Sequence, residues 1–255
     1  LPITELQRFR QLGSRTPGHP EHGVTPGVET STGPLGQGFA NAVGMALAEA
    51  MLAARFNRPN YEIVDHYTYV LAGDGDMMEG ISAEAASLAG HWGLNKLICI
   101  YDSNRISIEG RTDIAFTESV ADRFLAHGWH VQTIDGHDVH EIISAIRTAQ
   151  AEKKKPSLIV AQTTIGRKST REDSPKAHGE PLGEEGVSEL KKTLGLPDEA
   201  FHVPEDVYEY YAQKRKIWTA GYQEWKNLFA KWSQAFPQLR EEWDAAFALS
   251  IPEDL

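Results

Sequence analysis

Residues 67–106 read YTYVLAGDGDMMEGISAEAASLAGHWGLNKLICIYDSNRI, and this stretch decides the fold. Two apolar runs, 67–72 and 97–100, are typical of buried strands. Between them, residues 79–92 carry apolar side chains at helical spacing. A strand, a helix and a second strand in this order form a βαβ unit, so the two strands are predicted to be parallel neighbours.

A polar residue follows each of these predicted strands. Asp74 stands in the turn Gly73-Asp74-Gly75, and Asn104 comes thirty residues later. Parallel neighbours end at the same sheet edge, where open α/β sheets bind ligands, so Asp74 and Asn104 are predicted to lie together. Hard oxygen ligands beside a glycine turn suit Mg²⁺ that carries a diphosphate. Asp-Gly is also a common structural turn. The site is therefore indicated by Asp74 and Asn104 together, and by neither residue alone. Met78 argues against a calcium loop.

The remaining elements predict an α/β fold, with a parallel sheet between helix layers and a C-terminal helical extension. Helices are expected at 39–56, near 119–127 and from Asp138 to the lysine run 153–155, and strands at 129–134 and 157–163. Residues 1–38 are predicted to form ordered loops, and 166–186 a polar loop. We expect an α/β domain over 1–200 and a helical tail over 201–255.

The tail carries aromatic residues at steps of 4, 3, 4, 3 and 4, at positions 218, 222, 225, 229, 232 and 236. This spacing predicts a long helix with one buried aromatic face, and Pro237 is placed to start another helix. Such a face is typical of a core or an interface, so no chemistry is assigned to it.

Composition excludes several classes of function. The chain has 25 basic and 36 acidic residues and a net charge of −11, which argues against nucleic acid as a partner. The single cysteine, Cys99, excludes a disulfide framework and is expected to pack as a small apolar residue. No unbroken run of eighteen apolar residues is present, so no membrane partner is expected. A cytoplasmic protein is expected, although the missing initiator Met leaves a removed targeting segment open.

Five further sequence motifs carry a family resemblance: TPGHPE at 16–21, TPGVE at 25–29, GPLGQG at 33–38, MEGIS at 78–82, and HG at 178–179 ahead of PLG at 181–183. Together with Asp74 and Asn104, they resemble the thiamine diphosphate motif and, more narrowly, the transketolase family. The likeness covers essentially the whole chain. Asn or Asp usually precedes the final Asn of this motif. Here Ser103 takes that place, which leaves the matching ligand Asn104 intact.

The resemblance implies a site for thiamine diphosphate and Mg²⁺, with Ca²⁺ or Mn²⁺ as possible substitutes for the metal. The implied metal ligands are the side chains of Asp74 and Asn104 and the backbone carbonyl of Ile106. The residues that it implies for cofactor binding are Gly33, Pro34, Leu35, Asp74, Gly75, Glu79, Asn104, Ile165 and His178. Glu79 and Glu84 match acids that couple two cofactors across a dimer interface in this family, whereas their spacing alone fits a solvated helix face.

His19 and His178 match the catalytic histidines of the family. His19 would face the donor sugar and help to move protons, and His178 would lie near the diphosphate and the substrate hydroxyls. His22 has no motif support, and a zinc site at His19 and His22 is not expected in a Pro/Gly loop without further ligands. The run 135–138 is expected to form a turn and a helix N-cap, with no catalytic role.

The implied reaction is the reversible transfer of a two-carbon ketol unit from a ketose phosphate to an aldose phosphate, as in the pentose phosphate pathway. A complete transketolase also has a pyrimidine domain and a C-terminal domain, so this chain alone is expected to be inactive. The expected partner is a second copy of the full-length enzyme in a homodimer, or a complementary pyrimidine-domain polypeptide.

Two alternatives stay open at this point. One is another thiamine diphosphate enzyme, such as dihydroxyacetone synthase or deoxyxylulose-phosphate synthase. The TPGHPE motif and the aromatic tail argue against deoxyxylulose-phosphate synthase. The other is a non-catalytic regulatory or truncated fragment.

Overall fold

The computed structural model describes residues 1–248. The chain divides into two compact units, of which the first contains 1–46 and 67–201 and the second contains 47–66 and 202–255. Helix α2 (Gln37–Phe56) contributes its first part to one unit and its second part to the other. The first unit contains the sheet and all the residues predicted to bind the cofactor or the metal.

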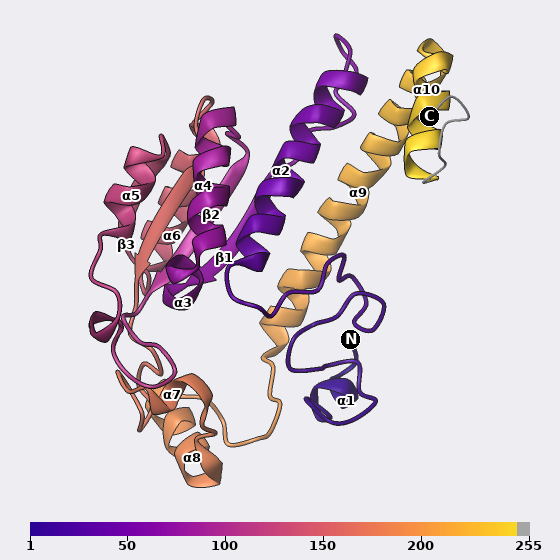
Figure 1. Cartoon of the computed structure of the whole chain (residues 1–255). Coiled ribbons are helices and arrows are strands. Elements are labelled where there is room, and N and C mark those ends of the chain that lie inside the picture. Colours follow the sequence, from indigo (N-terminus) through magenta and orange to yellow (C-terminus); the bar gives the residue numbers. More distant parts are fainter. Residues whose placement is uncertain (249–255) are drawn as a thin grey trace. The chain divides into compact units, whose positions relative to one another are not determined.

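The sheet of the first unit has four parallel strands (Figure 1). Its strands are β1 (Thr68–Gly73), β2 (Leu97–Ser103), β3 (His130–Asp135) and β4 (Ser157–Gln162), in the spatial order β1-β2-β4-β3. The predicted α/β fold and the predicted neighbours β1 and β2 are therefore confirmed. Gly73 pairs with Asp102 in the register of these two strands, so both strands end at the same edge.

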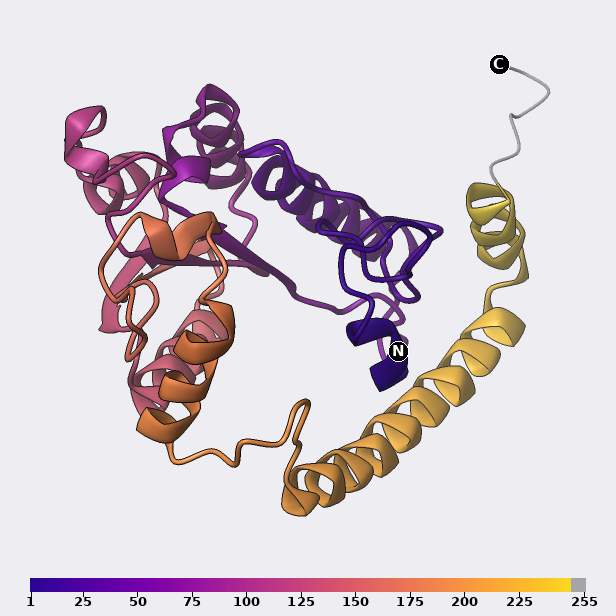
Figure 2. The same cartoon turned by 90° about the horizontal axis from the view of Figure 1, so that it is seen from below.

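Helices cover both faces of the sheet. The helix α4 (Gly80–Trp92), which joins β1 to β2, and α5 (Val120–Ala126) lie on one side, and α6 (Val139–Ala151) lies on the other (Figure 2). Alternate side chains of each strand point to opposite faces. On the α6 face, Ile98 and Ile159 form a cluster with Ala145 and Ala149.

The opposite face of the sheet holds the larger aromatic side chains. Phe124 and Trp129 are fully buried and meet edge to face, with ring centroids 4.9 Å apart. The Trp129 indole N–H donates to the carbonyl of Ala86 in α4 at 2.8 Å, so its polar atom is satisfied inside the core. Cys99, the third residue of β2, is fully buried as expected and pairs in register with Val70 and Leu158.

Several short elements were not predicted. Helix α3 (Asp74–Met78) begins directly after β1, so Asp74 lies at a helix N-terminus and not in a simple turn. The short helices α1 (Ile3–Leu6) and η1 (Thr112–Ile114) interrupt segments expected to be loops. The predicted loop 166–186 is too long, because α7 (Lys176–Gly179) and α8 (Gly183–Leu194) both begin within it.

The second unit is built on the helical tail. Helix α9 (Glu205–Ala235) is followed by α10 (Pro237–Phe247), and Pro237 starts α10 as predicted. Fully buried Trp232 packs in one cluster with Phe56. The prediction of one buried aromatic face holds only for the C-terminal part of α9, because Trp218 is 59% and Tyr222 61% exposed.

Helix α2 is long and apolar enough to cross a membrane by length and composition alone. This is weak support for a membrane span, because the core helix of a soluble protein passes the same test. Phe39, Ala42, Val43, Ala46 and Phe56 of this helix are buried within the protein.

Candidate functional site

The carboxylate of Asp74 joins the ends of the neighbouring strands β1 and β2. It is 5% exposed. Its Oδ2 accepts hydrogen bonds from the backbone N–H groups of Asn104 (3.1 Å) and Arg105 (2.9 Å), which follow β2. The βαβ unit therefore brings Asp74 and Asn104 into direct contact. Arg105 holds a left-handed φ of 63°, which aims its N–H at the carboxylate.

The other predicted metal ligands lie in the same turn. The side-chain oxygen of Asn104 accepts the Ile106 N–H at 3.0 Å, and the amide nitrogen of Asn104 donates to Asp102 at 3.2 Å. Ile106 is buried and opens a tight hairpin, in which the N–H of Ser107 donates to the carbonyl of Gly110 at 2.8 Å. A carboxylate, a carboxamide and a backbone carbonyl are thus gathered within one strand-end cluster.

These groups fit a magnesium ion that also binds phosphate. All three donors are hard oxygens, and Mg²⁺ in such sites takes one or two protein carboxylates and completes its shell with phosphate and water. Over residues 1–248, no group of three or more His, Cys, Asp or Glu side chains could hold a metal by itself. A metal site here would accordingly depend on the mixed donor set, with its remaining ligands supplied by the diphosphate.

Tyr101 belongs to this site and was missed by sequence reasoning. Its hydroxyl donates to Asp74 Oδ1 at 2.6 Å, and the side chain is buried. Burial, and then the hydrogen bond to Asp74, raise the pKa of Tyr101 above its usual range, so the hydroxyl keeps its proton and stays a donor. The feature of the sequence that could have identified Tyr101 was its position, two residues after Cys99 and so on the same face of β2.

A second carboxylate joins the glycine turn to the 33–38 loop. Asp76 Oδ2 accepts the N–H of Gly73 at 2.8 Å, and its Oδ1 accepts the N–H of Gly36 at 2.9 Å. Leu35 lies against the backbone of Gly75, since a Cβ added to Gly75 would stand 3.1 Å from Leu35 Cδ1. Two segments predicted to bind the cofactor are thereby brought together.

His19 lies beside the same loop. A Cβ built on Gly33 would stand 3.6 Å from Cγ of the His19 ring, so the imidazole packs over this glycine. The carbonyl of Pro34 accepts the N–H of Gln37 at 3.3 Å, which starts α2 immediately after the loop. The His19 ring and Leu35 are both exposed, so this part of the site is open to a ligand or a partner.

The loop after β4 emerges at the same edge, as the parallel topology predicts. The N–H of Thr163 donates to the carbonyl of Ser103 at 3.2 Å. Further along, the Ile165 carbonyl accepts the N–H of Asp173 at 3.0 Å, and the Asp173 carboxylate pairs with Arg111 at 3.2 Å. The loop that follows β4 is therefore tied to the hairpin that follows Asn104.

His178 lies in α7 and is exposed. It lines a pocket of about 510 Å³ together with Ile108 and Glu109, which belong to the hairpin after Ile106. His178 is thus placed beside the hairpin that follows Ile106, while His19 is placed beside the 33–35 loop.

Glu79 is the N-cap residue of α4, and its side chain is exposed, as is that of Glu84. A shared buried position for these two acids is not present within this chain.

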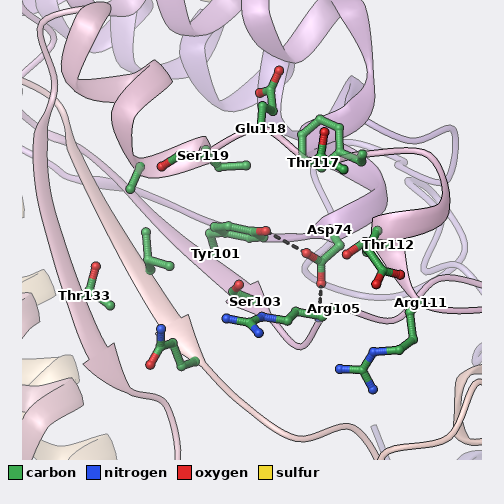
Figure 3. A pocket seen from close by; sticks show the side chains of 16 residues that line it. Asp74, Tyr101, Ser103, Arg105, Arg111, Thr112, Thr117, Glu118, Ser119 and Thr133 are labelled. Carbon is green, nitrogen blue, oxygen red and sulfur yellow. Dashed lines mark hydrogen bonds between the residues drawn. The ribbon is translucent and has the colours of Figure 1, made fainter.

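A polar pocket of about 550 Å³ opens beside Asp74 and Tyr101 at the ends of β2 and β4 (Figure 3). Arg105 and Arg111 contribute cationic side chains, and Glu118 contributes an acidic one. Among the predicted site residues that the structure describes, Asp74 alone lines this pocket. The loops with His19, Leu35 and His178 border other surfaces, so pocket volume alone does not locate the predicted cofactor site.

The expected turn and N-cap at 135–138 are confirmed. The Asp138 side chain accepts the N–H groups of His140 (2.7 Å) and Glu141 (3.3 Å) at the start of α6. Glu141 departs from a standard capping box, because its carboxylate accepts the N–H of Asp135 at 2.8 Å.

Comparison with known proteins finds relatives along nearly the whole chain. Residues 1–252 match the family described as transketolase, thiamine diphosphate binding domain. The chain is 52% identical over 256 residues to transketolase 2 of Escherichia coli (strain K12), an alignment that covers 100% of this chain and 38% of that protein. It is 54% identical over 239 residues to the chloroplastic transketolase of Spinacia oleracea, covering 92% of this chain and 32% of the relative.

Solved structures agree with these matches. A transketolase from Leishmania mexicana superposes with a TM-score of 0.96 at 48% identity, over 99% of this chain and 38% of that one. A Pichia stipitis transketolase in complex with sedoheptulose 7-phosphate superposes with a TM-score of 0.93 at 44% identity, again over 99% and 38%. The chain therefore spans well under half the length of the relatives that it matches.

Proposed function

Since this chain belongs to the transketolase family, whose thiamine diphosphate binding domain it matches over residues 1–252, we propose that it supplies the diphosphate-binding half of a transketolase active site. The observation that carries the proposal is the direct contact between Asp74 and the turn at Asn104. This contact gathers the oxygen donors that Mg²⁺ with a diphosphate requires at the carboxyl end of the sheet.

The residues divide the work of binding. The side chains of Asp74 and Asn104 and the carbonyl of Ile106 hold Mg²⁺, and the backbone of Gly75 contacts the diphosphate. The cofactor is also bound by the segments that contain Gly33, Pro34, Leu35, Glu79 and Ile165. When bound, thiamine diphosphate supplies the nucleophilic carbon and the ring that accepts electrons while a carbon–carbon bond is broken.

The two histidines serve the substrate side. His19, exposed beside Gly33, binds donor-sugar oxygens and moves protons near neutral pH. His178, beside the hairpin after Ile106, lies near the bound diphosphate and the substrate hydroxyls in this proposal. The proposed substrates are a ketose phosphate and an aldose phosphate, between which a two-carbon ketol unit moves. The P. stipitis relative in complex with sedoheptulose 7-phosphate supports this class of substrate.

The proposed protein partner is a second copy of the full-length enzyme in a homodimer, or a polypeptide that carries a pyrimidine domain. The chain spans 38% of the E. coli relative, so we expect no transketolase turnover from this chain alone. We propose the cytoplasm as the compartment. Turnover by the isolated 255-residue chain would contradict the need for a partner.

The test begins with the intact mass of the native protein, followed by calorimetric titration of the native assembly with thiamine diphosphate, with Mg²⁺ and with EDTA. We expect binding that depends on Mg²⁺. Asp74→Ala should weaken the affinity for the cofactor by about 100-fold or more, because a side chain that binds the metal directly is lost. His19→Ala should leave the affinity unchanged and slow ketol transfer.

A complete assembly that binds no cofactor with Mg²⁺ present would overturn the proposed function. Equal loss of cofactor affinity in Asp74→Ala and His19→Ala would overturn the division of roles. His22→Ala is the matched control for His19→Ala, because both histidines are exposed in the same Pro/Gly-rich loop. It should change neither binding nor transfer.

A further inference from the structure

Asp76 bridges two segments that lie far apart in the sequence. It is the third residue of α3, and its Oδ2 accepts the N–H of Gly73 at 2.8 Å, which caps the first turn of that helix. Its Oδ1 accepts the N–H of Gly36 at 2.9 Å, across a separation of 40 residues. One carboxylate thus satisfies a backbone donor in the glycine turn and another in the 33–38 loop.

Gly36 is held in a closely fitting position. It is buried and has a left-handed φ of 76°. A Cβ there would stand 2.8 Å from Ser82 Oγ and 2.9 Å from Ile81 Cγ2, so only glycine fits. The Ser82 hydroxyl donates in turn to the backbone carbonyl of Asp76 at 2.5 Å. Gly36 and Asp76 are therefore fixed to each other and to the start of α4.

The position of Leu35 follows from this arrangement. Its side chain covers the backbone of Gly75, with Cδ1 3.1 Å from where a Cβ of Gly75 would stand, yet it is still 50% exposed. The exposed part offers an apolar surface beside the glycine that contacts the diphosphate under the proposed function. If the N–H of Gly36 were released, the loop would lose the bond that holds Leu35 in this position.

We propose that Asp76 is a positioning residue that locks the 33–38 loop onto the glycine turn and so forms the cofactor surface of Leu35 and Gly75 before the cofactor arrives. This inference rests on the proposed function. The Asp76 carboxylate acts through its hydrogen bonds to the N–H groups of Gly36 and Gly73. Its effect is to spare the cofactor the cost of ordering a loop, because pre-ordered sites bind more tightly than sites that must be ordered on binding.

The lock depends on an acceptor at both oxygens. An ionised carboxylate accepts at each oxygen, whereas a carboxamide accepts at one and donates at the other. In Asp76→Asn, one of the two backbone N–H groups must therefore face an NH₂ group. The matched control is Asp122→Asn, because Asp122 is also the third residue of a helix, α5, but is exposed.

The first measurement is amide hydrogen exchange on the full chain. In Asp76→Asn, we expect exchange to be at least about tenfold faster than in the wild type in the peptide that contains Gly36 or in the peptide that contains Gly73, because one of the two charge-assisted hydrogen bonds is lost. Asp122→Asn should exchange there at the wild-type rate. Unchanged exchange at both Gly36 and Gly73 in Asp76→Asn would overturn the lock.

The second measurement is made on the native assembly, with Mg²⁺ and thiamine diphosphate. Asp76→Asn should raise the cofactor Kd about tenfold and leave kcat at saturating cofactor unchanged, since Asp76 acts through the loop. Asp122→Asn should match the wild type in both. Wild-type cofactor affinity in Asp76→Asn would overturn this inference alone, whereas a wild-type assembly that binds no cofactor would overturn the proposed function as well.

Discussion

Cys99 links a single side chain to the pH dependence of folding. The thiol is fully buried in β2, and burial, followed by the negative charge of Asp76, raises its pKa well above the ordinary value of 9.0. Below that ordinary value the thiol is protonated in the folded and the unfolded chain. At higher pH only the unfolded chain releases the proton, so the free energy of unfolding falls as pH rises.

We expect Cys99 to remove about 1.4 kcal/mol of stability between pH 8 and pH 10, as one buried group with an unfolded pKa near 9 would. Urea unfolding of the wild type and of Cys99→Ala at both pH values measures this contribution. The free energy of unfolding should fall by that much less in Cys99→Ala. Equal losses in the two proteins would contradict the assignment.

The site residues show how far single positions could be predicted. Asp74 and Asn104 were predicted to meet because strand topology alone brings them together, and they do. The bond between Asp76 and Gly36 was not predicted, because the two residues lie 40 positions apart with no periodic pattern between them. Tyr101 was not singled out, because an aromatic residue in a buried strand is most often a packing residue.

Among the elements, α4 makes an unusually close contact with the end of α5. A Cβ added to Gly90 would stand only 1.8 Å from the backbone carbonyl oxygen of His127. Alanine favours a helix interior over glycine by about 1 kcal/mol. The clash at Gly90 must outweigh that gain, because a backbone atom cannot move aside without shifting the whole segment.

We therefore expect Gly90→Ala to lower the free energy of unfolding by about 2 kcal/mol or more. Gly44→Ala is the matched control, since Gly44 lies inside α2 and an added Cβ would meet nothing within 4 Å. That variant should be more stable than the wild type by up to about 1 kcal/mol. Circular dichroism during urea unfolding measures both. Equal effects of the two substitutions would show that α4 does not pack as described.

Element prediction succeeded where a hydrophobic period runs through a segment. The strands and the helices α4, α5 and α6 agree with their predicted ranges to within a few residues, because burial on one face sets their patterns. Helix α3 could not be predicted, because DGDMM is too short to show a period. The start of α8 was placed too late, because its first turn, GEEG, reads as a polar loop.

At the scale of the whole molecule, the second unit depends on Trp232. This indole is fully buried, its N–H donates to the carbonyl of Phe56 at 3.0 Å, and Trp243 packs against it at 5.9 Å between ring centroids. Trp218 lies on the same helix and is 59% exposed. The sequence pattern gave both residues the same role, and the structure separates them.

We expect Trp232→Ala to reduce the stability of the second unit by about 3–5 kcal/mol through the cavity and the lost packing. Trp218→Ala should stay within about 0.5 kcal/mol of the wild type in the isolated chain. Denaturant unfolding followed by circular dichroism provides the comparison. A large loss in Trp218→Ala would mean that this side chain is covered in solution.

The aromatic spacing of α9 could not reveal this difference. A stripe at helical spacing predicts an apolar face, and whether that face is covered depends on what packs against it. Residues 47–66 and α10 cover only the C-terminal part of the stripe. For the same reason, the exposure of Leu35, His19 and His178 could not be predicted from the sequence motifs that contain them.

Asp74 and Asp76 hold the neighbouring loops through main-chain N–H groups, at positions 104 and 105 and at positions 36 and 73, and Asp74 also accepts from the Tyr101 hydroxyl at the end of β2. Every residue except proline offers such a donor. Apart from the proposed ligand Asn104 and the closely fitted Gly36, the side chains of these loops can therefore differ, within the limit that positive φ sets at 105, while the loops keep their places. What the site recognises can evolve separately from where the site is built.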